Sequence, residues 1–256
     1  MSELAIQTTG LRRTFGEFTA VDGIDLAVPV GSFYGFLGPN GAGKSTTIRC
    51  LTGLLAPSAG SISVLGLDFL RQPVAVKRQV GVVPEDLALF EGLSGLEMLS
   101  FVGQVHRLDA ATLKERSREL LALMGLEEAA GTFVSDYSHG MKKKLALAAA
   151  LLPAPKLLFL DEPFEGVDAV ASKQLKDLLE SFVQKGGTVF LTSHVLEIVE
   201  RLADHVGVIA KGQLVAQAPV EELRAGLGGE GKSLEQLFLD LVGDEREEIA
   251  LNWLGS

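Results

Sequence analysis

Two stretches of the chain have a glycine, lysine and serine spacing that can hold the phosphates of a nucleotide. They are GPNGAGKS at 38–45 and GLGGEGKS at 226–233, and both satisfy the pattern GxxxxGK followed by Ser or Thr. In this pattern glycines let the backbone approach anionic oxygens closely, and successive N–H groups point at those oxygens. Because both stretches satisfy the pattern, the predicted strands and helices on either side of each stretch must show which one is a phosphate loop.

The elements around 38–45 are those that a phosphate loop requires. The apolar run SFYGFLG predicts a buried strand before the loop, and STTIRCLTGL predicts a helix after it. Lys44 can then reach the β- and γ-phosphates, Ser45 can ligate Mg²⁺, and Thr46 can reach the α-phosphate. The helix dipole adds positive potential at the same point. We expect the phosphates to be cradled by Gly38, Pro39, Asn40, Gly41, Ala42 and Gly43.

The stretch at 226–233 lacks this context. It follows PVEELRAG, which predicts a helix with Pro219 near its start and Gly226 as its C-cap. No strand leads into it, so nothing would anchor its amides around a phosphate. Its glycines are interpreted as a flexible connector to a further helix, SLEQLFLDLV.

Two other apolar runs end in side chains that can do chemistry. KLLFLDE ends in Asp161 and Glu162, and GTVFLTSH ends in His194. Carboxylates at the end of a buried strand are costly without partners, and ligands of α/β sheets gather at the carboxyl ends of strands. If KLLFLDE lies beside the phosphate loop, Asp161 would hold Mg²⁺ and Glu162 would polarise an attacking water as general base. His194 would contact the γ-phosphate and help to fix Glu162.

The order of these patterns predicts an α/β fold, namely a P-loop NTPase core with a mixed or parallel sheet. Short N-terminal strands, read as ELAIQTT and FTAVDGIDLAV, form an antiparallel β-subdomain, and a helical subdomain is inserted at about 87–152. HVGVIAKGQLVAQ predicts a hairpin that turns at Lys211 and Gly212. We divide the chain into an ATP-binding domain at 1–225 and a linker, helix and acidic tail at 226–256.

Composition excludes several classes of protein. The formal net charge of −10 argues against a nucleic-acid binder, and the only basic run, Lys142 to Lys144, is interpreted as a solvated helix face. Cys50 is the single cysteine, so there is no disulfide framework, and the four histidines lack metal-ligand spacing. The start has no signal-peptide layout. The most apolar segment, 145–160, is too short and too interrupted by prolines to span a bilayer.

DYSHGMKKKLALAAAL, at 136–151, has two interpretations. Ser138 is placed to cap an Ala/Leu-rich helix, which is an ordinary structural role. Alternatively, this helix end, with Ser138 and Gly140, faces the phosphates bound by a second molecule.

The ordered set of motifs resembles the ATP-binding subunit of a bacterial ABC transporter of the export type. The resemblance runs from about Glu3 to Val242, with GPNGAGKS as Walker A, YSHGM as the signature, LLFLDE as Walker B, EGVD as the D-loop and TSH as the switch histidine. It implies an ATPase in which two subunits sandwich two Mg-ATP head to tail. Each signature then completes the other subunit's site, which favours the second interpretation of Ser138 and Gly140.

The resemblance also assigns residues that the patterns do not. It implies that Phe15 stacks on adenine, that Asp168 belongs to the D-loop and that Glu85 occupies the Q-loop position near Mg²⁺. Two positions depart from the family pattern. His139 replaces the first glycine of the signature, and Glu85 stands where glutamine is commonest, so the first adds bulk and the second adds negative charge beside the triphosphate.

The same resemblance implies partners and a location. The pore lies on separate transmembrane permease subunits, one of whose helices docks at about 86–99, and a second ATP-binding subunit completes a homodimer or heterodimer. The chain would then be cytoplasmic and peripheral on the inner face of the membrane. A non-transport ABC ATPase acting on DNA or ribosomes is the alternative, against which stand the single cassette and the absence of a long coiled coil. An ATP-binding regulatory module without hydrolysis is disfavoured by Glu162 and His194.

We predict that only the upstream loop binds ATP. Lys44→Ala should abolish ATP binding or hydrolysis, whereas Lys232→Ala should leave both nearly unchanged, because only 38–45 stands between a strand and a helix. Comparable losses in the two variants, measured by nucleotide binding and phosphate release, would contradict the assignment.

Overall fold

Two β-sheets form the framework of the protein in a computed structural model, which describes residues 3–226, 236, 238, 239 and 241. The six-stranded sheet has the order β11 (Gln213–Pro219), β10 (His205–Ala210), β4 (Phe33–Leu37), β9 (Thr188–Ser193), β8 (Leu157–Asp161) and β7 (Val80–Val83). The five-stranded antiparallel sheet contains β1 (Leu4–Phe15), β2 (Phe18–Ile24), β3 (Ala27–Pro29), β5 (Ala59–Val64) and β6 (Leu67–Asp68).

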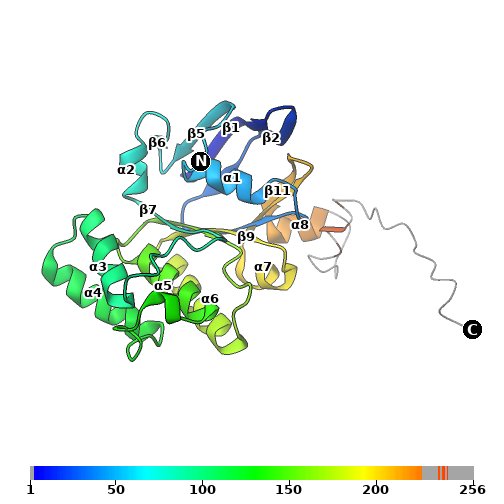
Figure 1. The fold of residues 1–256 in the computed structure, drawn as a ribbon. Helices are drawn as coiled ribbons and strands as arrows, with labels where there is room; N and C mark the ends of the chain where they lie inside the picture. The colour runs from blue at the N-terminus through cyan, green and yellow to red at the C-terminus, as the bar shows by residue number, and fades with distance from the viewer. Residues whose placement is uncertain (1–2, 227–235, 237, 240, 242–256) are drawn as a thin grey trace, which may run out of the picture.

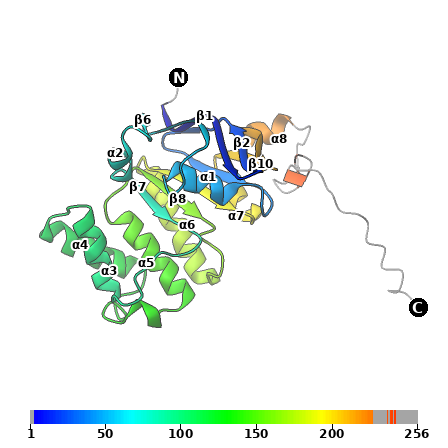
Figure 2. The ribbon, with the colours of Figure 1, turned by 45° about the horizontal axis from the view of Figure 1, so that its top comes forward.

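Helices cover both faces of the six-stranded sheet (Figures 1 and 2). On one face α1 (Lys44–Leu51) lies between this sheet and the antiparallel sheet. On the other face lie α5 (His139–Leu151), α6 (Ala169–Gln184) and α7 (Leu196–Leu202). The remaining helical segments are α2 (Pro73–Lys77), α3 (Gly95–Val105), α4 (Ala110–Leu123), the 3₁₀ turn η1 (Val134–Asp136) and α8 (Val220–Gly226).

The buried strands read as continuous apolar runs because both of their faces are covered. Successive side chains of a strand point to opposite faces. In β8, Leu158 and Leu160 belong to the core shared with α5 and α6, whereas Phe159 belongs to the core shared with α1. Phe190 of β9 lies in that second core, where it stacks on Tyr34 with ring centroids 5.4 Å apart.

The carboxyl ends of the parallel strands β4, β7, β8, β9 and β10 meet at one edge of the six-stranded sheet. The end of β8 lies beside the phosphate loop, as the predicted role of Asp161 requires, because Asp161 Oδ1 is 3.5 Å from Ser45 Oγ. Within the sheet, however, β8 does not pair with β4, because β9 pairs with both strands and separates them. Asp161 is instead paired in register with Thr192 of β9. The phosphate loop, Asp161 and Thr192 therefore stand at the ends of three adjacent strands.

The N-terminal sheet differs from its predicted form in one element. The run FTAVDGIDLAV, interpreted as one strand, is divided into β2 and β3, which pair with different parts of β1. The chain breaks around Gly23, whose φ is +69°, and Asp25, whose Oδ1 accepts a hydrogen bond from Gly10 N at 2.6 Å. The predicted hairpin at Lys211 and Gly212 is confirmed by the antiparallel pairing of β10 with β11.

The helices α3, α4 and α5 pack together beside the β7 edge of the sheet (Figures 1 and 2). Ser94 begins α3 with a capping box completed by Glu97, and Asp109 caps α4 through the amides of Ala111 and Thr112. Within the described part of the chain, no helix has both the length and the apolar character needed to cross a membrane.

The second glycine-rich stretch lies outside the described residues from position 227 onward, and so does Lys232. Its predicted feeding helix is present as α8 at Val220–Gly226, with Pro219 as the last residue of β11. Four residues of the predicted tail helix are described, and all four are helical: Gln236, Phe238, Leu239 and Leu241.

Phe190→Ala tests where the stability of this fold resides. Phe190 is fully buried among three aromatic rings, so its truncation should lower the free energy of unfolding by about 3–5 kcal/mol. Val74→Ala is the control, because Val74 is exposed on α2. Urea denaturation of both variants measures the difference, and equal midpoints would show that the aromatic cluster is not a principal source of stability.

Candidate functional site

The phosphate loop joins β4 to α1, and its path leaves no room for side chains at two glycines. A Cβ on Gly38 would lie 2.4 Å from the carbonyl oxygen of Ile209. A Cβ on Gly43 would lie 2.5 Å from the carbonyl oxygen of Ala20, and Gly43 has a φ of +111°, which favours glycine. The loop is therefore wedged between the two sheets, and the first turn of α1 follows it directly.

The Lys44 ammonium lies under this loop. Its Nζ donates hydrogen bonds to the carbonyl oxygens of Gly38 at 2.7 Å and Pro39 at 3.2 Å. Only 7% of the residue is exposed, and this burial lowers the pKa of Lys44, an effect opposed by the nearby carboxylates of Glu162, Asp161 and Glu85. A cation held this way within the loop is suited to phosphate oxygens.

Oxygen ligands from three elements meet at Ser45. The Ser45 Oγ lies 3.5 Å from Glu85 Oε2, in the segment after β7, and 3.5 Å from Asp161 Oδ1, at the end of β8. Asp161 also accepts a hydrogen bond from the Thr192 hydroxyl. A hydroxyl and two carboxylates fit Mg²⁺, which takes few protein ligands and keeps several waters. Among the residues that the structure describes, no group of three or more His, Cys, Asp or Glu side chains is arranged to hold a metal ion.

Glu162 and His194 form a pair at the same edge. His194 Nδ1 lies 3.0 Å from Glu162 Oε2, and the Glu162 side chain is 10% exposed. The Glu162 backbone has a φ of +48°, a left-handed conformation that is strained for a non-glycine residue. Its amide is directed at Thr192, whose hydroxyl oxygen lies 3.2 Å away and whose carbonyl oxygen lies 3.3 Å away. A carboxylate so placed can accept a proton while the imidazole orients it.

A cavity of about 540 Å³ opens between these groups. It brings together most of the residues that the sequence predicts to meet the phosphates. Its lining consists of Phe18, Ala20, Asn40, Gly41, Gly43, Lys44, Ser45, Thr46, Glu85, Glu162, Glu165 and His194.

The aromatic side of this cavity is supplied by Phe18, a residue that sequence reasoning missed. Phe18 is 63% exposed, and it pairs with Phe15 across the end of the β1–β2 hairpin. Phe15, the predicted adenine contact, is 43% exposed and does not line the cavity. The Arg13 guanidinium lies 4.5 Å from the centroid of the Phe15 ring. A nearby second aromatic in a hairpin is the signal that could have identified Phe18.

The structure does not bring Ser138, Gly140 or Asp168 to this cavity. Ser138 caps α5, as predicted, by accepting a hydrogen bond from the Met141 amide at 3.2 Å. Asp168 caps α6, and the hydrogen bonds from the amides of Ala171 and Val170 lower its pKa. Within the described residues, all three therefore stand apart from the phosphate loop of their own chain.

Lys143 is the largest departure from the sequence interpretation. The run Lys142 to Lys144 was expected on a solvated helix face, but Lys143 is only 5% exposed. Its ammonium donates to the carbonyl oxygens of Glu162, at 2.9 Å, and of Glu165. The burial has a topological cause: α5 packs between the α3–α4 pair and the sheet, and Lys143 lies on the side of α5 that faces the turn after β8.

Comparisons with known proteins agree on one family. The profile described as ABC transporter matches residues 21–165. The daunorubicin/doxorubicin resistance ATP-binding protein DrrA of Streptomyces peucetius is 42% identical over 88% of this chain and 68% of its own length. The bacitracin transport ATP-binding protein BcrA of Bacillus licheniformis is 36% identical over 86% of this chain and 71% of its own.

Solved structures give the same result. The structure of an ATP-binding subunit of an ABC transporter superposes with a TM-score of 0.88 at 30% identity, covering 93% of this chain and 99% of that one. A dimeric ATP-binding cassette bound to ADP and Pi superposes with a TM-score of 0.77 over 84% of this chain and 98% of that one. Its 21% identity supports a shared fold alone.

Proposed function

Since the chain belongs to the ABC transporter family as an ATP-binding subunit, we propose that it hydrolyses Mg-ATP at the cavity around Lys44 and Glu162 to drive export. The observation that carries the proposal is the pairing of a buried carboxylate, Glu162, with His194 at the mouth of a phosphate loop, 3.0 Å apart. The proposal includes the domain boundaries predicted from the sequence, with an ATP-binding domain at 1–225, a helical subdomain within it at about 87–152, and a separate C-terminal part at 226–256.

Each side chain has a distinct task in the proposed reaction. Lys44 and the loop amides bind and orient the β- and γ-phosphates, and Ser45, Asp161 and Glu85 hold Mg²⁺. When bound, Mg²⁺ neutralises charge on the phosphate oxygens. Glu162 accepts a proton from the attacking water.

His194 positions that base and lies within the same cavity lining. Its imidazole holds one Glu162 oxygen and leaves the other for water. Because Thr192 contacts both Asp161 and the Glu162 amide, it keeps the metal ligand and the base at a constant separation. Phe15 and Phe18 supply aromatic surface for adenine, with Arg13 stacked on the first of them.

Glu162→Gln tests this chemistry directly. The substitution keeps the shape of the side chain but removes the base, so ATP should still bind while hydrolysis falls by about 10²–10⁴-fold. Because ATP then persists, the variant should elute as a dimer on gel filtration with Mg-ATP. Glu180→Gln, on the exposed face of α6, is the matched control. Hydrolysis at the wild-type rate in Glu162→Gln would overturn the assignment.

A second cassette, either a copy of this chain or a related one, completes each site in this proposal. Ser138 and Gly140 stand at the N-terminal end of α5, away from their own phosphate loop, where a helix end can meet the phosphates bound by another subunit. His139 stands between them in the chain, and its ring lies against Gly166, two residues before Asp168, so we assign His139 and Asp168 to the same surface in this arrangement.

Mixing two inactive variants tests the composite site. A Ser138→Arg chain keeps its phosphate loop but cannot complete its partner, and a Lys44→Ala chain has the reverse defect. Their mixture should recover part of the ATPase activity, provided that one site turns over alone. Asp109→Ala is the control, because it removes the cap of α4 at a similar cost of about 0.5–2 kcal/mol. Full activity of Ser138→Arg by itself is the result incompatible with this role.

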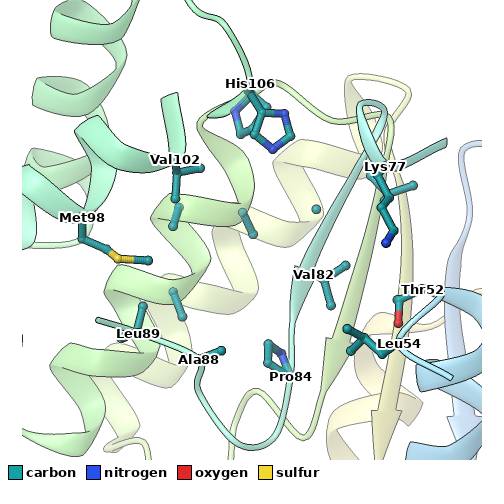
Figure 3. A pocket seen from close by; sticks show the side chains of 16 residues that line it. Thr52, Leu54, Lys77, Val82, Pro84, Ala88, Leu89, Met98, Val102 and His106 are labelled. Atoms are coloured by element: carbon teal, nitrogen blue, oxygen red, sulfur yellow. The ribbon is translucent and has the colours of Figure 1, made fainter. Parts of the chain in front are cut away.

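Separate permease subunits are the proposed membrane partners. A cleft of about 360 Å³ lies between the β7 edge of the sheet and helices α3 and α5 (Figure 3). Val82 and Pro84 line its sheet side, and Met98 and Val102 line its helical side. Since the cleft is apolar and adjoins the segment 86–99, it can receive a short helix of a permease at the inner face of the membrane.

The proposed class of exported compound is taken from the names of two relatives. DrrA and BcrA carry names that link them to daunorubicin and doxorubicin resistance and to bacitracin transport. We therefore propose an antibiotic as the cargo. Direct action on DNA or ribosomes has no counterpart among these relatives, and the net charge of −10 opposes it.

A further inference from the structure

Lys143 connects the signature helix to the backbone that carries the proposed base. Its ammonium is buried and donates to two main-chain carbonyl oxygens, those of Glu162 and Glu165. These carbonyls belong to one turn, in which the Glu165 amide donates to the Glu162 carbonyl at 3.3 Å. The lysine thus holds the main chain at both ends of a turn that begins at Glu162.

A second contact joins the same two elements. His139 precedes Lys143 by four residues, so the two side chains share one face of α5. The His139 ring lies against Gly166, where an added Cβ would be 2.9 Å from His139 Cδ2. The first turns of α5 therefore contact the segment from Glu162 to Gly166 at both of its ends.

The turn held by Lys143 is one that requires outside support. Glu162 and Gly166 both have left-handed backbone, with φ of +48° and +66°. Such a conformation at a non-glycine residue persists only where surrounding contacts impose it. Burial lowers the pKa of Lys143, while Glu165, Glu162 and Glu85 oppose that shift and favour the charged form. A charged donor makes hydrogen bonds that are roughly twice as strong as neutral ones.

We propose that Lys143 is a positioning residue for ATP hydrolysis, which acts by holding the Glu162–Glu165 turn so that the Glu162 carboxylate faces the attacking water. The inference rests on the proposed role of Glu162 as base. Lys143 lies on the helix that Ser138 caps, so the same helix carries both the proposed signature residues and this positioning contact.

Lys143→Met and Lys143→Arg separate positioning from binding. Methionine removes the donors at similar length, so kcat should fall roughly 10²-fold, as for a misplaced catalytic group, while KM for ATP stays within about twofold. Arginine keeps charged donors and should restore a large part of kcat. Lys142→Met is the matched control, since Lys142 pairs with exposed Glu91 and such pairs contribute little. A wild-type kcat in Lys143→Met, or a loss confined to KM, would overturn the proposal.

The double variant shows whether Lys143 acts through Glu162. In a Glu162→Gln background, Lys143→Met should lower the residual rate by no more than about twofold, because the group that it positions is already absent. Full multiplication of the two losses contradicts the mechanism. If Lys143→Met fails to fold by circular dichroism, Lys143→Gln takes its place, and failure of both to fold makes the residue purely structural. Wild-type protein without ATPase activity would instead defeat the proposed function itself.

Discussion

The burial of charge at the carboxyl edge of the central sheet is the constraint on which the rest of the structure depends. Two ammonium groups, Lys44 and Lys143, are held there almost without solvent, beside Asp161 and Glu162. Buried charges are tolerated only when each of them has partners. The wedged glycine loop, the left-handed backbone at Glu162 and the packing of α5 against the sheet all supply those partners.

The strands and the positions of the polar side chains at their ends could be predicted because the signals are local. Continuous apolar runs indicate strands covered on both faces, and the strand, glycine loop and helix around Lys44 follow one another along the chain. Asp161, Glu162 and His194 were predicted for the same reason, since each ends such a run. The P-loop fold and the ATP-binding subunit class are confirmed by the comparisons.

Features that depend on which segments become neighbours could not be predicted in this way. The placement of β9 between β4 and β8 is a property of the whole sheet, and it gives Thr192 a role that no motif indicates. In the sequence, nothing distinguishes Lys143 from its neighbours Lys142 and Lys144, and only the packing of α5 shows that Lys143 is the buried one. The division of 18–28 into β2 and β3 depends on a side-chain contact between Asp25 and Gly10.

The position of β9 has a consequence for how the site forms. Thr192 of β9 contacts Asp161, the proposed metal ligand, and His194, which directly follows the strand, contacts Glu162, the proposed base. A slip of one residue in the pairing of β9 would turn the Thr192 side chain to the opposite face and move His194, which follows it. The proposed metal ligation and the proposed proton transfer would therefore be gained or lost together. A molecule with β9 misaligned would then lack ATPase activity altogether, and the turnover rate of a preparation would report the fraction of molecules with a correctly paired sheet.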